Sequence, residues 1–201
     1  ALNKLHEPRD GEMNYVGEAI KLVCRELAGR LPVIGFCGAP FTVASYMIEG
    51  GATRDFLTTK KLIYANPALW RALLDKLVAV QIDFLKMQVA SGASVLQIFD
   101  SWVGALSPND YRAFVLPHTR RLISAASSLG VPVIHFGTGT SGLLELLREA
   151  GGDVIGVDWR IDLGAAWQRI GFDRAVQGNL DPVLLFAPRE TLRPAVEHIV
   201  R

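Results

Sequence analysis

The sequence has few of the features that assign a function directly. It contains only two cysteines, Cys24 and Cys37, in 201 residues. One falls in a helical pattern and the other directly follows a strand pattern, so we expect reduced thiols in a cytoplasmic setting and no disulfide framework. No apolar run approaches the ~20 residues of a membrane-spanning helix, and the N-terminal residues do not resemble a secretory signal.

An excess of charge of one sign is also lacking. Twenty-one Lys and Arg residues stand against 20 Asp and Glu residues, which leaves a formal net charge of +1. Domains that bind nucleic acid or anionic membrane surfaces usually carry a clustered basic excess. We therefore expect neither nucleic acid nor a membrane as a partner, and a polyanionic ligand would have to be bound by a few local cations.

Three common cofactor and metal motifs are absent as well. The sequence has no Gly-x-x-x-x-Gly-Lys phosphate loop, no Cys-x-x-Cys pair and no His-Glu-x-x-His helix. Each of these motifs binds its ligand through a fixed spacing of backbone amides or side chains. Their absence indicates a protein that depends little on cofactors.

Hydrophobic residues make up 50% of the sequence, and they recur as short strand-like runs that alternate with amphipathic helical runs. The strand runs lack polar alternation, which is typical of parallel strands covered on both faces. Strands are predicted at residues 32–36, 94–99, 131–136, 154–157 and 174–177. Helices are predicted at 15–27, 60–64, 68–91, 109–129, 141–150, 163–170 and 189–200. In the longest of these helices, one apolar stripe is formed by Leu73, Leu77, Val80 and Phe84.

These strand-then-helix units follow one another over residues 1–201 without a linker, so we expect a single domain. Their order requires parallel pairing with right-handed crossovers. Two α/β architectures fit: an open doubly wound sheet and a closed (β/α)₈ barrel. The dinucleotide-binding form of the open sheet is weakened because no Gly-x-Gly-x-x-Gly segment follows the first strand. A barrel has eight strands, whereas five are predicted, so periodicity leaves the closure of the sheet undecided.

Functional groups in parallel α/β folds gather where the strands end. Asp100 and Asp158 each follow a strand, and each could be a general acid–base carboxylate or could instead cap a helix or bind a backbone turn. His135 could be a metal ligand, a proton donor or a hydrogen-bonded core residue. Tyr46 could bind a ligand or simply pack. The other histidines are predicted to lie at the surface without a role: His6, His118 and His198.

Several segments at these strand ends together resemble uroporphyrinogen decarboxylases. The first is Gly-Phe-Cys-Gly-Ala-Pro-Phe-Thr at 35–42, with Tyr-Met-Ile-Glu-Gly-Gly at 46–51 close behind. The later ones are Leu-Gln-Ile-Phe-Asp-Ser at 96–101, Gly-Val-Asp-Trp at 156–159 and Gln-Gly-Asn-Leu-Asp-Pro at 177–182. They follow one another in the family's order and at compatible spacing over nearly the whole chain.

The resemblance implies a (β/α)₈ TIM barrel, here a partial barrel with about five parallel strands, that is a cytoplasmic homodimer when complete. It implies a carboxy-lyase of haem biosynthesis that converts the four acetate side chains of a tetrapyrrole, uroporphyrinogen III, to methyl groups and needs no metal or organic cofactor. Tyr46 then matches a tyrosine that contacts substrate, and Ser101 matches a serine that binds a substrate carboxylate. Phe36 and Phe99 match apolar residues of the cleft.

Three parts of the family pattern have no counterpart in this sequence. They are an Arg-Gln-Ala-Gly-Arg segment, an aspartate that binds the pyrrole nitrogens and a histidine in a Gly-His-Gly motif. The five strands would then be the third to the seventh of the barrel, and the catalytic residues would lie outside this chain. We therefore expect the chain to be part of something longer and to be inactive alone.

Two alternative functions stay open on the sequence. A zinc-dependent corrinoid or coenzyme M methyltransferase would use the same scaffold, but its His-x-Cys ligand pair corresponds here to residues 135–137, His-Phe-Gly, which lack the thiolate. A non-catalytic barrel fragment could instead act as a binding module, because an exposed sheet edge favours self-association. The sequence also leaves open whether Asp158, Trp159 and Asn179 contact substrate.

Overall fold

The computed structural model describes residues 2, 5, 11–51 and 53–200. In this part of the chain five strands form one parallel sheet, as predicted, and they lie in sequence order. The first strand begins and ends two residues later than predicted, and the others lie within one or two residues of their predicted bounds. The strands are β1 (Ile34–Gly38), β2 (Val95–Asp100), β3 (Val133–Gly137), β4 (Val154–Gly156) and β5 (Ala175–Gln177).

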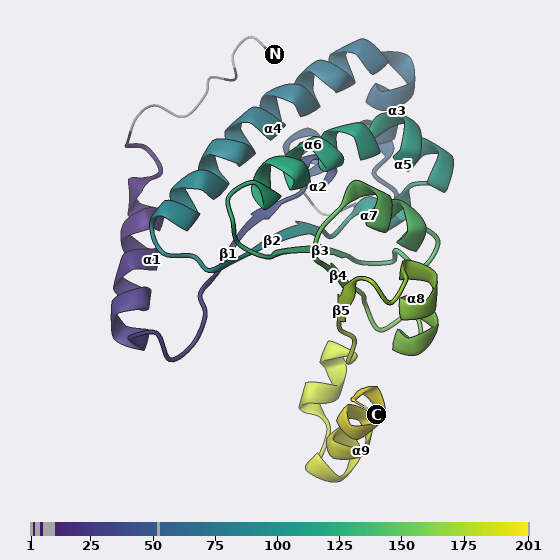
Figure 1. Cartoon of the computed structure of the whole chain (residues 1–201). Coiled ribbons are helices and arrows are strands. Elements are labelled where there is room, and N and C mark those ends of the chain that lie inside the picture. The colour runs from purple at the N-terminus through teal and green to yellow at the C-terminus, as the bar shows by residue number, and fades with distance from the viewer. Residues whose placement is uncertain (1, 3–4, 6–10, 52, 201) are drawn as a thin grey trace.

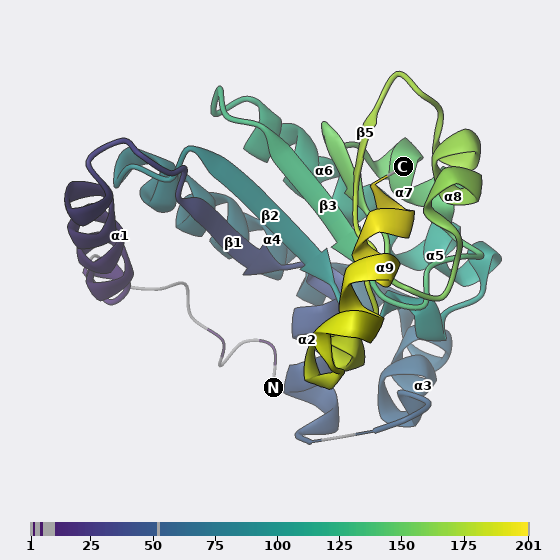
Figure 2. The same cartoon turned by 90° about the horizontal axis from the view of Figure 1, so that it is seen from below.

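Helices cover only one face of this curved sheet (Figure 1). Viewed from below, β1, β2 and β3 lie in front of the helices, and their other face is open (Figure 2). A doubly wound sheet would carry helices on both faces, so the singly covered sheet is a partial barrel. The covering helices are α4 (Pro67–Ala90), α6 (Leu116–Ser127), α7 (Leu144–Ala150) and α8 (Leu163–Ile170), with α1 (Asn14–Leu27) beyond the β1 end of the sheet.

Side chains alternate between the covered and the open face of the sheet, as the pleat requires. In β1, Gly35 and Cys37 are buried while Ile34 and Phe36 are exposed. The register places Phe99 of β2 beside Phe136 of β3, and both are half-buried on the open face. The prediction that both faces are covered is therefore wrong for the described residues, although the open face is rich in apolar side chains.

The core lies between the sheet and the helix layer. Trp70, Leu74, Val78 and Leu85 of α4 are completely buried there, and the Trp70 indole N–H donates a hydrogen bond of 2.9 Å to the Phe114 carbonyl. In the predicted stripe of α4 only Leu73 is buried; Leu77, Val80 and Phe84 are half-buried. No helix in the described ranges is long and apolar enough to cross a membrane.

Two helical predictions need correction. Residues 109–129 were predicted as one helix but form α5 (Pro108–Phe114) and α6, separated at Val115. Pro117 explains the break, since it has no N–H to donate to the carbonyl of residue 113. The structure also has α2 (Pro40–Glu49), a helix that the sequence did not predict, and α3 (Leu57–Ala65), which is longer than predicted.

The segment after β5 extends away from the helix layer (Figures 1 and 2). It comprises the short 3-10 helix η3 (Pro182–Phe186) and the helix α9 (Arg189–Ile199), and neither contains a buried residue. The described part of the chain therefore ends in an element that packs little against the rest.

Gly35 marks a close approach of α4 to the sheet. A Cβ added there would lie 2.8 Å from the Gln88 Oε1 and 3.0 Å from Ala93 Cβ and Leu96 Cδ2. We expect Gly35→Ala to lower the free energy of unfolding by about 1–3 kcal/mol, because overpacking of an interior costs about that much. The matched control is Gly142→Ala, where nothing lies within 4 Å of an added Cβ. Denaturant unfolding of both variants is the measurement, and equal stabilities would contradict the close approach.

Candidate functional site

Three aromatic rings gather where β1 and β2 end. Tyr46 of α2 is 56% exposed, and its ring lies edge-on to Trp102 with 5.9 Å between centroids. The Trp102 ring is in turn 5.6 Å from the ring of Phe56. Together with Ser45 and the loop residues before Phe56, these rings line a pocket of about 420 Å³. The segments that follow β1 and β2 thus form a pocket with aromatic walls, one of which is the exposed Tyr46.

Two further rings lie on the open face of the sheet. Phe36 of β1 and Phe99 of β2 have ring centroids 5.7 Å apart at an interplanar angle of 40°. Phe36 is 56% exposed, so one side of the pair faces the open side of the partial barrel. The structure therefore brings together the two phenylalanines that the resemblance assigned to a cleft.

Ser101 is half-buried and follows directly on β2. Its backbone carbonyl accepts a hydrogen bond of 2.5 Å from the Thr138 hydroxyl, which joins the ends of β2 and β3. The next residue, Trp102, donates its backbone N–H to the Thr42 hydroxyl at 3.3 Å. Ser101 therefore lies on a turn that is held from both neighbouring strand ends.

Asp100, at the end of β2, forms a hydrogen bond to α2 on the helix-covered side of the sheet. Its Oδ1 accepts a hydrogen bond of 2.7 Å from the Thr42 hydroxyl, and its side chain is completely buried on the helix-covered side. Burial raises the pKa of Asp100 to about 7, since the charged carboxylate is desolvated. Its Oδ2 has no hydrogen-bond partner among the described residues. Asp100 thus supports α2, the helix of Tyr46, and does not face the pocket.

Asp158 binds a backbone turn, one of the two roles that the sequence left open. Its Oδ2 accepts the Gly139 N–H at 2.6 Å, and its Oδ1 accepts the Arg160 N–H at 3.2 Å. The Arg160 guanidinium also pairs with the same carboxylate and stacks 4.1 Å from the centroid of the Trp159 ring. Asp158 is 4% exposed, and its carboxylate stabilises the loops that follow β3 and β4.

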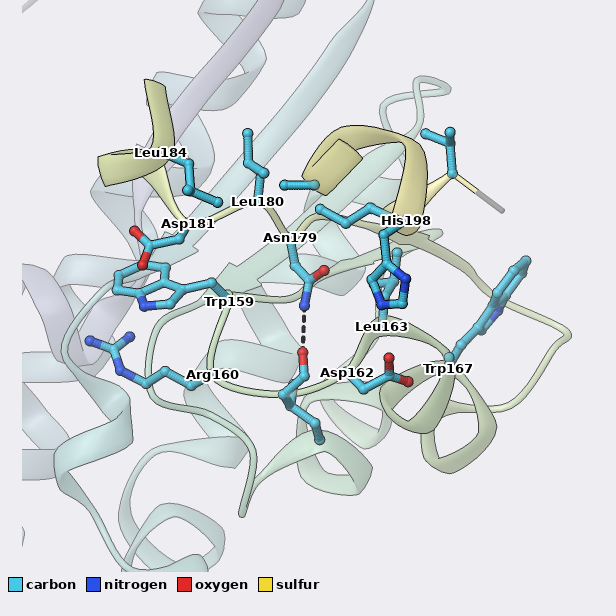
Figure 3. Close-up of a pocket in the computed structure, with 15 residues that line it drawn as sticks. Trp159, Arg160, Asp162, Leu163, Trp167, Asn179, Leu180, Asp181, Leu184 and His198 are labelled. Atoms are coloured by element: carbon cyan, nitrogen blue, oxygen red, sulfur yellow. Dashed lines mark hydrogen bonds between the residues drawn. The ribbon is translucent and has the colours of Figure 1, made fainter. Parts of the chain in front are cut away.

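Asn179 has a similar structural role after β5. Its side-chain N–H groups donate to the carbonyls of Asp158 at 3.1 Å and Ile161 at 2.6 Å. Figure 3 shows this amide pointing into a pocket of about 790 Å³, with Trp159 and Arg160 to one side and Trp167 to the other. The aspartates of this pocket are helix caps, because Asp162 accepts the Ala165 N–H and Asp181 accepts the Val183 N–H. The Asn179, Asp162 and Asp181 side chains of this pocket therefore form hydrogen bonds to the backbone of the chain.

His135 lies in the core. It is completely buried on the helix-covered face of β3, with its Nδ1 3.4 Å from the Leu147 carbonyl oxygen. Burial lowers its pKa to about 4, because the protonated ring would be desolvated. Within the described ranges no three His, Cys, Asp or Glu side chains are grouped closely enough to hold a metal ion. The structure therefore favours the core role of His135 over the roles of metal ligand and proton donor.

Of the other histidines, one lies where it was predicted and one does not. His118 was predicted at the surface but is 8% exposed, and its Nδ1 lies 3.1 Å from the Asp75 carboxylate between α6 and α4. His198 is exposed, as predicted, and His6 lies outside the described residues. Cys24 is half-buried and Cys37 is buried, and both are free cysteines in the structure.

Thr42, Phe56 and Trp102 belong to the site but were not singled out from the sequence. Trp102 directly follows the segment at 96–101, so its position after a strand was an available signal. Thr42 lies in the first turn of α2, which the sequence did not predict. Phe56 lies at no strand end, and only the structure brings it to the pocket, with a left-handed backbone (φ 51°) before α3.

The whole chain, residues 1–201, matches the family model described as uroporphyrinogen decarboxylase (URO-D). It is 55% identical over 200 residues to a uroporphyrinogen decarboxylase of Solibacter usitatus, with 100% of this chain and 58% of that protein covered. It is 53% identical over 189 residues to that of Carboxydothermus hydrogenoformans, with 94% and 54% covered. The chain thus spans a little more than half the length of these curated relatives, and the matches confirm the resemblance of the strand-end segments.

A solved structure supports the fold. A methyltransferase from Methanosarcina mazei matches with a TM-score of 0.85 over 99% of this chain and 59% of its own, at 22% sequence identity. Identity this low carries the architecture alone, and the architecture agrees with a partial barrel.

The buried carboxyl of Asp100 predicts a pH dependence of stability. Its pKa is about 7 in the folded chain against an ordinary value of 3.8. The protonated group therefore stabilises the fold fully below about pH 4, and this contribution is lost as the pH rises to 7. We expect the free energy of unfolding of the native chain, relative to Asp100→Asn, to fall by up to about 4 kcal/mol over this range and to level off above it.

Denaturant unfolding at several pH values tests this expectation. The control is Asp83→Asn on α4, whose carboxylate is 77% exposed beside Lys86, and it should change stability little across the same range. A difference between native chain and Asp100→Asn that is independent of pH would contradict the buried-carboxyl interpretation.

Proposed function

The chain belongs to the uroporphyrinogen decarboxylase family, and from this we propose that it supplies the central barrel strands of an enzyme that converts uroporphyrinogen III to coproporphyrinogen III. The observation that carries the proposal is identity of 55% to a curated relative over 200 residues, in segments that include the pocket. The proposed enzyme is a carboxy-lyase of porphyrin biosynthesis, with the whole chain forming one incomplete barrel domain.

The chemistry defines what such a site must provide. Protonation of a pyrrole carbon turns the ring into an electron sink. The bond between the acetate CH₂ and its carboxylate can then break, and carbon dioxide leaves. A proton added to the CH₂ gives a methyl group, and loss of the first proton from the ring carbon restores the pyrrole. The enzyme needs hydrogen-bond donors and cations for the substrate carboxylates, and a proton donor near the ring. Because the ring itself takes up the electrons, the proposal includes no metal or organic cofactor.

We assign the substrate contacts of this chain to four residues. The hydroxyls of Tyr46 and Ser101 would bind substrate carboxylates, and the rings of Phe36 and Phe99 would pack against the flat pyrrole rings. Three of these residues are supported by their positions, since Tyr46 is exposed at the pocket and the two phenylalanine rings pack against each other on the open face. Ser101 is supported by its place on the fixed turn next to Trp102.

The assembly and location of the enzyme are part of the same proposal. A homodimer is proposed for the complete protein on the family resemblance alone. A cytoplasmic location is supported by the two unpaired thiols, of which Cys37 is buried, since free cysteines are typical of reducing compartments.

The methyltransferase alternative is less well supported. The Methanosarcina mazei structure carries that name and shares the fold, but His135, where a zinc ligand would be needed, lies under the helix layer. A catalytic zinc keeps one coordination position open to water or substrate, and a buried core histidine offers none. The binding-module alternative is favoured only by the open face and edges of the sheet.

Activity of the chain alone and in a chimera separates these possibilities. In the chimera, this chain replaces the matching segment of the Solibacter usitatus relative. We expect the chimera to form coproporphyrinogen and the chain alone to form none, because the chain lacks the family's arginine, aspartate and histidine motifs. Porphyrin chromatography after oxidation measures both. Turnover by the chain alone would contradict the expected inactivity, and a folded but inactive chimera would contradict the decarboxylase proposal.

Removal of either hydroxyl in the chimera tests the assigned contacts. A hydrogen bond to a charged group contributes about 1.5–3 kcal/mol, so Tyr46→Phe and Ser101→Ala should each lower kcat/KM by about 10- to 150-fold. The control is Tyr15→Phe, which removes the hydroxyl of an exposed side chain on α1, a helix that contributes no residue to the pocket lining. Activity that is unchanged in either site variant would remove that residue from the substrate site.

A further inference from the structure

Arg160 is the only Lys or Arg residue in the described loops that directly follow the five strands. These loops are residues 39, 101–102, 138–143, 157–162 and 178–181. They form the C-terminal rim of the sheet, where barrel enzymes bind their substrates. A ligand with many negative charges at this rim would therefore meet one cation from these loops.

The Arg160 side chain is held in place from two sides. Its guanidinium Nη1 pairs with the Asp158 carboxylate, and its central carbon lies 4.1 Å from the centroid of the Trp159 ring, beside it in Figure 3. The Asp158 carboxylate is fixed in turn, because it accepts the backbone N–H groups of Gly139 at 2.6 Å and of Arg160 at 3.2 Å. A long side chain thus has a defined position before a ligand binds, which reduces the entropy lost on binding.

One edge of this guanidinium is available to a ligand. Among the described residues only its Nη1 has a hydrogen-bond partner, and the side chain is 50% exposed. The free groups, Nε and Nη2, are the pair with which an arginine donates two parallel hydrogen bonds to one carboxylate. Arg169 of this chain binds Glu145 in this way, with distances of 2.8 Å from Nε and 2.9 Å from Nη2. The free edge of Arg160 is therefore suited to a carboxylate.

The surroundings of Arg160 belong to the inner part of the sheet. It follows β4, which has β3 on one side and β5 on the other. The adjacent Trp159 lines a pocket of about 310 Å³ together with Gln97 and Phe136, two side chains of the open face. In a closed barrel this face is the interior, and the pocket lies at its C-terminal mouth. The loop of Arg160 thus lies beside the cleft in the complete barrel as well.

The distance along the rim suits a tetrapyrrole. Ser101 follows β2 and Arg160 follows β4, so two strand spacings, or about 10 Å along the sheet, separate the two strand ends. Uroporphyrinogen carries an acetate and a propionate group on each of its four pyrrole rings, and its carboxylates lie all around the macrocycle. One substrate molecule can therefore place different carboxylates at the two positions.

We propose that Arg160 is a substrate-binding residue, which binds a side-chain carboxylate of the tetrapyrrole through Nε and Nη2. This contact rests on the proposed function and adds a cation to the rings and hydroxyls already assigned. The fixed position of the guanidinium does not rest on it, because Asp158 and Trp159 are part of the same loop.

Porphyrin binding to the chimera tests the contact. The probes are uroporphyrin, which has four acetate and four propionate groups, and coproporphyrin, which has only the propionates. We expect Arg160→Gln to raise the Kd of uroporphyrin about 10-fold in a fluorescence titration, because the charge-assisted pair is lost. Arg160→Lys keeps the charge without the planar fork and should raise it less. An equal loss for coproporphyrin would assign the contact to a propionate, and an unchanged Kd for coproporphyrin would assign it to an acetate.

Arg112→Gln is the matched control. Arg112 also pairs through Nη1 with a single carboxylate, that of Glu149 at 2.9 Å, and its side chain is 59% exposed, but it lies on the helix α5. This variant should leave both Kd values unchanged. An unchanged affinity for uroporphyrin in Arg160→Gln, an equal loss in Arg112→Gln, or a chimera that binds neither porphyrin would overturn the contact.

Two further measurements separate the contact from other causes. The Gly139 N–H bonds to Asp158 and not to Arg160, so its amide exchange in the chain should be the same with and without Arg160→Gln. Faster exchange together with weaker porphyrin binding would assign the effect to the loop and overturn the contact. A chimera that binds uroporphyrin through Arg160 but forms no coproporphyrinogen would support the contact and count against the proposed function.

Discussion

The hydrogen bond between Thr42 and Asp100 is the contact on which the candidate site depends. It joins the first turn of α2 to the end of β2, so that Tyr46 on the helix and Ser101 on the strand end belong to one fixed unit. The bond lies in a dry environment, where an unpaired carboxylate oxygen is costly. Burial of this carboxyl group raises its pKa to about 7, which is unfavourable for the charged form. The hydrogen bond that it makes fixes the spacing between α2 and the end of β2, which are far apart in sequence.

The face of the sheet decides which side chains can reach a substrate. Phe36 and Phe99 lie on the open face, whereas Asp100 and His135 lie on the face that the helices cover. Because strand side chains alternate, a difference of one position separates Phe99 from the buried Asp100. The polar residues with the most obvious chemistry are thus structural, and the groups left for a ligand, apart from Arg160, are rings and hydroxyls. Under the proposed function, these rings and hydroxyls would contact the flat, carboxylate-rich substrate.

Much of the fold follows from the sequence, and the failures have physical causes. Five strands and most helices were predicted because apolar runs and helical periodicity are local signals. The helix α2 was not, since Gly38, Pro40 and the glycines at 50–51 read as turn residues, although Pro in the first turn also starts a helix. The choice between open sheet and barrel needed the side on which the helices pack, and no local pattern contains it. The site residues Tyr46 and Ser101 came from the family resemblance, whereas Phe56 required the folded chain.

Gln81 and Gln88 show why the remaining part cannot be read from periodicity. Helical periodicity identifies the buried face of a helix by its apolar residues alone. The stripe predicted for α4 in this way contains Leu77 and Phe84, which are only half-buried. The stripe that faces the sheet contains the two glutamines, whose side chains form hydrogen bonds with backbone groups of β1, because buried backbone groups need partners. A buried amide is favourable there although it would be costly in a purely apolar layer. The polar residues of the helix thus match the unpaired groups of the strand, and this match exists only in three dimensions.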